Sequence, residues 1–316
     1  MSFSSEVKEE MAVRPDSARH CRIASLAAML HFSGYIGADG AGIQTENEYA
    51  VRFFQAALGK FAECEVDVLR LPGGARGGGF KVLIREQEQI GRLLNAVRME
   101  AAAEIGSFAG LPLDGMLVQK SCCRKAFLRA SFLLSGSVSN PEKSYHFEIV
   151  CQNEEDAKFL ADLMNSLSLD ARIIPRRRRS RQQLVVYLKE GEQISDALGL
   201  MGAHQSLMKL ENARIVRNIA GSVNRRVNCE TANLMKTVDA AVRQTEDIRY
   251  LRDNGGLEQL PAGLRQAAEL RLKMPDATLR ELGEALDPPI GRSGVNHRLQ
   301  RLSELAARLR GEEHPL

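Results

Sequence analysis

Tryptophan is absent from this chain of 316 residues, and aromatic residues make up only 5% of it. The cores must therefore be built mainly from Leu, Ile, Val, Ala and Phe. No run of apolar residues approaches the roughly 18 needed to span a membrane, and the first residues, MSFSSEVKEEM, contain no apolar signal-peptide core. We therefore expect a soluble, cytoplasmic protein, and the length allows two domains that each bury a core.

Charge and cysteine spacing give little functional signal. The formal net charge is only +3, so any case for a nucleic-acid partner depends on where the charge is placed. The six cysteines form no CxxC pair, and none is followed or preceded by a histidine at a metal-ligand spacing. We expect reduced structural thiols, no metal site and no cofactor.

The chain contains an internal repeat, visible as short matches that recur in the same order. Leu30–Gly34 matches Phe132–Gly136 at an offset of 102 residues, and Val82–Glu86 matches Val186–Glu190 at an offset of 104. The periodicities around these matches predict a duplicated unit of helix, strand, helix, hairpin and helix.

The duplication predicts a pseudo-twofold domain. Two glycine-ended helices, over 18–34 and 122–136, are expected to pack through their small residues. The hairpins of the two halves are expected to join into one curved antiparallel surface. In the first half, alternation over 63–71 predicts a strand with one buried side, and a single helix is expected over 86–103.

The hairpin tip of the second half is strongly basic. Its five arginines are Arg176, Arg177, Arg178, Arg179 and Arg181. Such a cluster favours contact with phosphates, which would supply salt-dependent affinity with little choice of sequence. The alternative interpretation is a solvated turn, which many arginine-rich tips are.

The last third of the chain is helical in pattern. A helix is expected over about 211–251, with Gly221 as the flexible point between the halves of the protein. Farther on, Thr278 and Glu281 are spaced as a capping box at the start of a short helix. A turn over 287–291 contains two prolines and cannot be helical. A final helix is expected to begin with Ser293 as its cap, which completes a helix-turn-helix layout.

The polar side chains of this layout are candidate DNA contacts. Arg can pair with guanine and Asn with adenine in a bidentate manner, and hydroxyl groups and helix N-termini can hold phosphates. The candidates are Thr278, Arg280, Arg292, Ser293, Asn296, His297, Arg298, Gln300 and Arg301. Arg298 is ambiguous, because its position also flanks the buried side. The alternative interpretation is a small three-helix cap with a solvated polar face.

Two stretches carry a resemblance to a known family: KAFLRASFLLSGSVSNPEKSYHFEI (Lys125–Ile149) and RSGVNHRLQRL (Arg292–Leu302). With them, nearly the whole chain resembles the WhiA family of bacterial regulators, which join a LAGLIDADG homing-endonuclease-like domain to a C-terminal helix-turn-helix. The resemblance implies an α+β fold. In that fold a pseudo-twofold duplicated LAGLIDADG-type domain, with helices on a curved antiparallel sheet, is followed by an all-α helix-turn-helix domain.

The resemblance also implies limits for the domains. The LAGLIDADG-like domain is expected over 1–200, with repeats over about 1–105 and 106–200. A helical linker is expected over 201–222, and the helix-turn-helix DNA-binding domain over 223–316.

The chain departs from the nuclease motif at two positions. Alignment of Leu26–Gly34 and Leu128–Gly136 with that nine-residue motif places Ser33 and Ser135 where the nucleases have metal-binding aspartates. Phosphodiester hydrolysis in that family needs carboxylates that hold divalent ions, and a neutral hydroxyl is a poor ligand for them. We therefore expect no catalytic residues, no nuclease activity and no other enzyme activity.

The resemblance implies a sequence-specific transcription regulator that binds double-stranded promoter DNA, cytoplasmic and associated with the nucleoid. Its processes would be sporulation, cell division and chromosome segregation, and the N-terminal domain would be the place for a regulatory protein partner. Two other functions stay open. One is a protein-interaction scaffold in cell division with secondary DNA binding, and the other is an active LAGLIDADG endonuclease, which the two serines disfavour.

Overall fold

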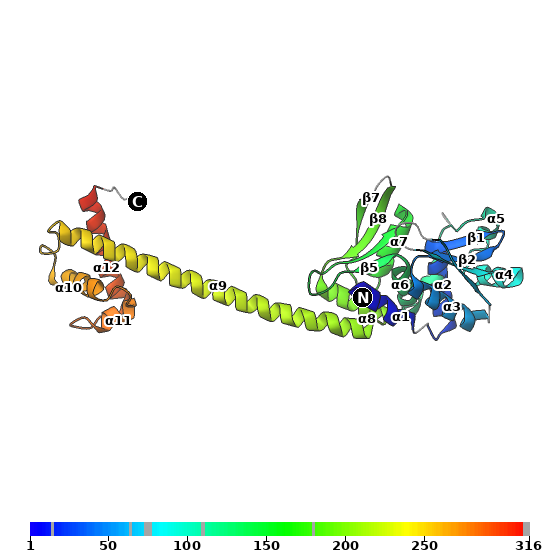
Figure 1. Cartoon of the computed structure of the whole chain (residues 1–316), viewed down its shortest axis with the longest axis horizontal. Helices are drawn as coiled ribbons and strands as arrows, with labels where there is room; N and C mark the ends of the chain where they lie inside the picture. Colours follow the sequence, from blue (N-terminus) through cyan, green and yellow to red (C-terminus); the bar gives the residue numbers. More distant parts are fainter. Residues whose placement is uncertain (14–15, 63–64, 73–77, 109–110, 179–180, 312–316) are drawn as a thin grey trace. The chain divides into compact units, whose positions relative to one another are not determined.

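The computed structural model describes residues 1–13, 16–62, 65–72, 78–108, 111–178 and 181–311. The chain forms two compact units, Met1–Asn218 and Ile219–Leu316 (Figure 1). No helix in the described ranges is both long enough and apolar enough to cross a membrane.

The first unit contains the predicted duplication. Its first repeat consists of α1 (Phe3–Ala12), α2 (Arg19–Ser33), β1 (Gly34–Gly37), β2 (Gly40–Thr45), α3 (Glu48–Ala62), β3 (Asp67–Arg70), β4 (Phe80–Ile84), α4 (Gln87–Ala96) and α5 (Ala101–Ile105). A 3-10 turn, η1 (Gly115–Val118), leads into the second repeat. That repeat consists of α6 (Ser121–Ser135), β5 (Gly136–Val138), β6 (Phe147–Cys151), α7 (Glu154–Asn165), β7 (Arg172–Arg178), β8 (Arg181–Leu188) and α8 (Gly191–Met201).

Each repeat builds its own four-stranded antiparallel sheet. The strand orders are equivalent, β1-β2-β4-β3 in one sheet and β5-β6-β8-β7 in the other. The registers are equivalent as well, since Gly34 pairs with Ile43 and Gly136 pairs with Ile149. The duplicated α+β fold is thus confirmed. The hairpins were expected to join into one curved antiparallel surface, but no strand pairing joins them in the described residues: β4 pairs with β2, and β8 pairs with β6, so the two sheets are separate.

At Gly34 and Gly136 the chain passes directly from a helix into a strand. The strands that begin there, β1 and β5, were not predicted. Both glycines are extended, with φ −66° and ψ 144° at Gly34 and φ −83° and ψ 155° at Gly136. A Cβ atom at Gly34 would lie 2.1 Å from the carbonyl oxygen of Leu30, and one at Gly136 would lie 2.3 Å from Cδ2 of Phe132. Lack of space therefore requires glycine at both corners.

The helices α2 and α6 pack against each other through small residues, as predicted. Ala24 and Ala126 are fully buried in this contact, and the hydroxyl of Ser25 donates to the carbonyl of Ala126 at 3.2 Å. The larger side chains fill the space between the helices and the sheets, and Phe132 stacks on Phe147 with ring centroids 4.9 Å apart.

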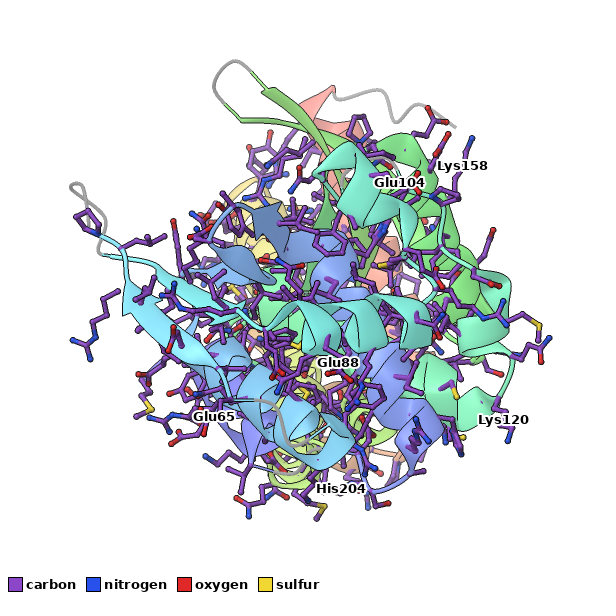
Figure 2. All side chains as sticks on the ribbon, turned by 90° about the vertical axis from the view of Figure 1, so that its right-hand side faces the viewer. Glu65, Glu88, Glu104, Lys120, Lys158 and His204 are labelled. Atoms are coloured by element: carbon purple, nitrogen blue, oxygen red, sulfur yellow. The ribbon has the colours of Figure 1, made fainter. Side chains whose placement is uncertain are left out.

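Charged side chains lie on the outside of the first unit. Glu88, Glu104 and Lys158, for example, are exposed and point away from the ribbon core (Figure 2). This division between an aliphatic and aromatic interior and a charged surface supplies the burial that stabilises the fold.

Two expectations for the first repeat are wrong in detail. All four residues of β3 are exposed, because β3 is an edge strand that pairs only with β4. The single helix expected over 86–103 is broken after Ala96, where Arg98 has φ 58°. The break turns Val97 and Met99 into the core, and both are buried.

The described part of the second unit is helical. It contains α9 (His204–Asp253) from Ile219 onward, α10 (Ala262–Lys273), α11 (Leu279–Glu284) and α12 (Arg292–Arg310). Ile248 and Leu251 of α9 pack with Leu282, Val295 and Leu299 in its core. The helical pattern over 211–251 is confirmed. Gly221 lies inside α9 and does not interrupt it.

Candidate nucleic-acid interface

The helices α11 and α12 form a helix-turn-helix with a tightly fixed corner. Glu281 Oε2 accepts from the Thr278 amide at 2.7 Å, and the Glu281 amide donates to Thr278 Oγ1 at 3.3 Å, so the predicted capping box is confirmed. The amide of Ile290 donates to the carbonyl of Gly283 at 3.0 Å. A Cβ atom at Gly283 would lie 2.3 Å from the carbonyl oxygen of Ile290, so this close approach requires glycine.

The helix α12 has one buried side and one polar side. The buried side consists of Val295, Leu299, Leu302 and Ala306. The exposed residues of its first half that carry polar side chains are Arg292, Ser293, Asn296, His297, Gln300 and Arg301. They form three adjacent pairs that recur every four residues, which places them along one continuous face.

The prediction that Ser293 caps α12 is wrong. The cap is Gly291, which is extended (φ −71°, ψ 162°) and offers no side-chain cap, so the helix begins at Arg292, two residues earlier than a cap at Ser293 would place it. Ser293 is therefore an exposed residue of the first turn. The amides of that turn lack a side-chain cap and face the same end of the helix as the candidate contacts.

Three of the candidate arginines differ in the groups that their side chains bind. Arg298 is half-buried, and its Nη1 donates to the carbonyl of Gly263 in α10 at 3.2 Å. Arg280 is paired with Glu284 at 2.9 Å, and Arg301 is paired with Glu304 at 2.8 Å. These last two pairs are on the surface, where such pairs contribute little in water and exchange readily for another anion.

Arg271 is a structural residue of this motif that sequence reasoning missed. It is only 2% exposed, and its Nη1 donates to the carbonyls of Pro275 at 3.3 Å and Ala277 at 2.7 Å. Burial lowers the pKa of its guanidinium group. Arg271 thereby holds the segment that leads into Thr278. Nothing in the sequence marks it, because an arginine in a helix is ordinarily solvated.

A groove of about 800 Å³ lies in the second unit between α9, the segment before α11 and the start of α12. Thr278, Arg280, Arg292 and Asn296 all line it. The fold thus brings four of the predicted contacts, from two helices, to one concave surface.

The basic hairpin of the first unit is formed by β7 and β8, whose pairing continues to the end of the hairpin. Arg176 pairs in register with Gln183, and Arg178 pairs with Arg181. Arg176 donates to Glu148 Oε1 at 2.9 Å. Burial raises the pKa of Glu148, but hydrogen bonds from His146 and Arg176 outweigh burial and lower it. The side chains of Arg177, Arg178 and Arg181, and the whole of Arg179, lie outside the described residues.

The two serines at the nuclease positions are bonded to the backbone. The hydroxyl of Ser33 donates to the carbonyl of Gln44, and that of Ser135 donates to the carbonyl of Ser131 at 3.4 Å. Each is the last residue of its helix, α2 or α6.

Two aspartates of the first unit, Asp39 and Asp114, lie outside the two helix ends and have hydrogen-bond partners of their own. Asp39 accepts from Lys81 at 2.6 Å and from the Tyr35 hydroxyl at 2.7 Å. Asp114 accepts from the amide of Met116 at 2.8 Å. These hydrogen bonds lower the pKa of both aspartates, through Lys81 for Asp39 and through the Met116 amide for Asp114. Both carboxylates therefore serve local structure.

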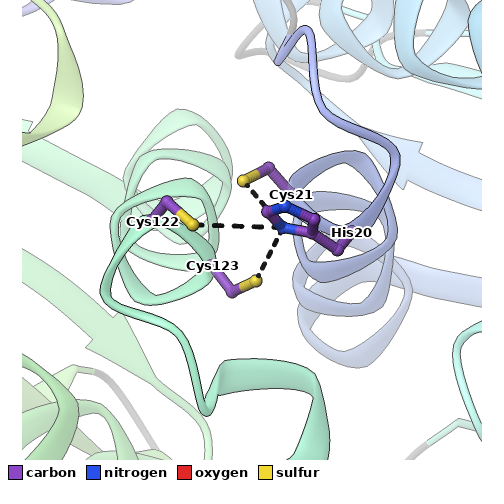
Figure 3. Close-up of side chains that lie close together, drawn as sticks. All are labelled: His20, Cys21, Cys122 and Cys123. Carbon is purple, nitrogen blue, oxygen red and sulfur yellow. Dashed lines mark hydrogen bonds between the residues drawn. The ribbon is translucent and has the colours of Figure 1, made fainter.

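A cluster of His20, Cys21, Cys122 and Cys123 lies at the other end of the same helix pair (Figure 3). The spacing of the cysteines along the chain did not indicate that three of them lie together. His20 Nδ1 lies 3.3 Å from the Sγ atoms of Cys21 and Cys123 and 3.9 Å from that of Cys122. The signal that could have found the cluster is the repeat itself, since the offset of 102 residues maps His20-Cys21 onto Cys122-Cys123.

Comparison with known proteins gives matches over both units. The family model for the "WhiA LAGLIDADG-like domain" matches residues 45–107 and 124–220, and that for the "WhiA C-terminal HTH domain" matches residues 223–306. The probable cell division protein WhiA of Lachnoclostridium phytofermentans is 43% identical over 317 residues, which cover 98% of this chain and 100% of the relative. The protein of the same name from Clostridium tetani is 41% identical over 319 residues, with 99% of each chain covered.

A solved structure is similar over the same length. The crystal structure of full-length DUF199/WhiA from Thermatoga maritima superposes with a TM-score of 0.58 and 25% identity, covering 98% of this chain and 99% of that one.

Proposed function

This chain belongs to the WhiA family, and from that membership we propose that it is a transcription regulator that binds double-stranded promoter DNA sequence-specifically through its second unit. Its proposed process is cell division, the process in the names of the curated relatives, extended to sporulation and chromosome segregation. The protein would then act in the cytoplasm, in association with the nucleoid.

The observation that carries this proposal is the exposed polar face on the first half of α12. Arg292, Asn296 and Gln300 recur at intervals of four residues on a helix whose opposite side is fixed in the core. A recognition helix reads the edges of bases with such residues near its N-terminus. We assign guanine contact to Arg292 and adenine contact to Asn296, because each side chain has the matching donors and acceptors.

The neighbouring residues are assigned to the phosphates. Thr278, Arg280 and Ser293 lie around the N-terminal end of α12, where the helix dipole also favours an anion. His297 and Arg301 extend the polar face. Arg298 is assigned a positioning role, because its bond to Gly263 holds α12 against α10.

The first unit is proposed to add contacts without cutting DNA. Arg176 and the four arginines beyond it would bind phosphates and raise affinity for all sequences. The same unit is the proposed place for a regulatory protein partner. Nuclease activity is not proposed, since Ser33 and Ser135 present neutral hydroxyls that donate to backbone carbonyls. Incubation of the purified protein with duplex DNA and magnesium tests this point, and specific cleavage would contradict it.

The main test uses the full-length protein. Immunoprecipitation of the protein with genomic DNA identifies candidate sites, and a duplex that contains such a site then serves for affinity measurements. Asn296→Ala should weaken binding to this duplex by about 1–3 kcal/mol, roughly 5- to 150-fold, and relax the choice of one base pair.

The matched control is Arg308→Ala, which removes an exposed arginine from the last turn of the same helix. It should leave the choice of bases unchanged. Equal affinity of the wild type for specific and random duplexes would sink the proposal and favour the interaction scaffold.

A further inference from the structure

We propose that His20, Cys21, Cys122 and Cys123 bind one Zn²⁺ ion that joins the two repeats of the first unit (Figure 3). Two ligands come from α2 and two from α6, so the ion links helices that are about a hundred residues apart in the chain. This site lies outside the DNA-binding surface and does not depend on the function proposed above.

The set of donor atoms is suited to zinc. Three thiolates and one imidazole make a Cys3His set, which is among the usual ligand sets of structural zinc. Sulfur ligands exclude the hard cations Mg²⁺ and Ca²⁺, which prefer oxygen. All four protein ligands are present, so no position is left open for water or substrate, and the site is structural in type.

The spacing of the donor atoms also matches a single tetrahedral ion. Zn–S bonds of about 2.3 Å and Zn–N bonds of about 2.05 Å place two sulfurs about 3.8 Å apart and a sulfur and a nitrogen about 3.6 Å apart. The three distances from His20 Nδ1 to sulfur are 3.3, 3.3 and 3.9 Å. All four atoms lie within 4.8 Å of one another, so one ion can contact all of them after small side-chain rotations.

The fold reaches this arrangement through its duplication. His20 and Cys21 are the second and third residues of α2, and Cys122 and Cys123 are the second and third residues of α6. The pseudo-twofold packing of α2 on α6 brings these equivalent dipeptides together. A chance cluster of surface residues has no reason to obey the symmetry of the fold.

The burial of the ligands favours tight retention of an ion. Cys21 and Cys123 are 6% and 4% exposed and pack with Ala24 and Ala126, whereas His20 and Cys122 are exposed. An ion can therefore enter from solvent on one side and be enclosed by apolar side chains on the other. Three thiolates and Zn²⁺ leave one negative charge, which the positive N-terminal ends of two helices help to stabilise.

The test measures the zinc content of the full-length protein after purification without chelators. Wild type should contain about one zinc ion per chain, and Cys122→Ser and Cys123→Ser should each contain less than a tenth of that. Cys122 is exposed, so its substitution separates loss of the ion from loss of the buried packing. The matched control is Cys229→Ser, an exposed cysteine of α9 outside the cluster, which should keep the full zinc content.

A conservative variant and a second metal sharpen the result. His20→Cys should retain one zinc ion, because four thiolates also bind zinc tetrahedrally. Cobalt in place of zinc should give the absorption bands of a tetrahedral thiolate site in wild type and lose them in Cys122→Ser. Absence of zinc from folded wild type, full zinc in both serine variants, or a disulfide between Cys21 and Cys123 in the isolated protein would each overturn the proposal.

Discussion

The two ends of the α2–α6 pair have opposite chemistry on the same symmetric frame. The serine end carries Ser33 and Ser135, and the cysteine end carries His20, Cys21, Cys122 and Cys123. The two ends are separated by about 20 Å, because an α-helix rises about 1.5 Å per residue. A duplicated helix pair places equivalent residues beside each other at both ends, so the residue type alone decides which metal chemistry each end can support.

The serine end presents two hydroxyls, Ser33 and Ser135, which are poor ligands for a hard cation. Its hydroxyls donate to the carbonyls of Gln44 and Ser131, which leaves a neutral surface where a nuclease would hold magnesium. The cysteine end has soft ligands that converge on one point. The proposed metal ion therefore lies at the end of the pair where it would link α2 to α6.

The largest expected effect comes from emptying the cysteine end. If the zinc concentration is about a thousand times the dissociation constant, the ion stabilises the folded first unit by about 4 kcal/mol. A chelator should then lower the Tm by about 8–16 °C, since 1 kcal/mol corresponds to about 2–4 °C for a domain of this size. Calorimetry of the full-length protein measures the shift.

The control for this prediction is Cys122→Ser, whose Tm should be lower from the start and insensitive to the chelator. An unchanged Tm of wild type on chelation would remove the contrast between the two ends, because neither end would then bind a stabilising ion.

The next effect concerns the corner that follows the serine end. Gly136→Ala should destabilise the first unit by about 1–3 kcal/mol, because overpacking forces neighbouring groups to move. A Cβ atom there would lie 2.3 Å from Cδ2 of Phe132, a ring that is fully buried and cannot give way easily. Urea denaturation measures the change as a lower midpoint with an unchanged slope.

Gly59→Ala is the matched control. Gly59 lies in α3, and a Cβ atom there would have no neighbour within 4 Å. That substitution should be neutral or stabilise the protein by up to about 1 kcal/mol, because alanine favours a helix. If the two variants lose equal stability, space at the corner is not what requires glycine.

The sequence predicts the duplicated frame better than it predicts what the frame brings together. The glycine-ended helices and the capping box at Thr278 follow from local spacing, and both are confirmed. The prediction that Ser293 caps α12 is wrong, because Gly291 is extended and takes the cap position ahead of it.

The cysteine cluster and Arg271 escaped sequence reasoning for a different reason. His20 and Cys122 are far apart in the chain, and only the packing of α2 on α6 makes them neighbours. Arg271 is unremarkable by type, and its role depends on the two carbonyls that the chain brings to it. Motif spacing reports on ligands within one element, whereas these sites are assembled between elements.

The smallest effect tests whether the serine end can be converted. In the double variant Ser33→Asp, Ser135→Asp, two carboxylates stand at helix C-terminal ends, where the dipole is unfavourable to negative charge by about 0.3–1 kcal/mol each. The variant should therefore be about 0.6–2 kcal/mol less stable than wild type in the absence of divalent ions. Because paired carboxylates can hold Mn²⁺ or Mg²⁺, millimolar amounts of either ion should restore part of this loss.

The matched control is the double asparagine variant, which has nearly the same shape without the charge and should not respond to the ions. Urea denaturation with and without Mn²⁺ measures both. Recovery in the aspartate variant alone would show that the serine end keeps the geometry of a hard-cation site and lacks only its charge. If neither variant responds, the two helix ends have also moved apart, and the contrast between the two ends of the pair is then one of shape as well as of residue type.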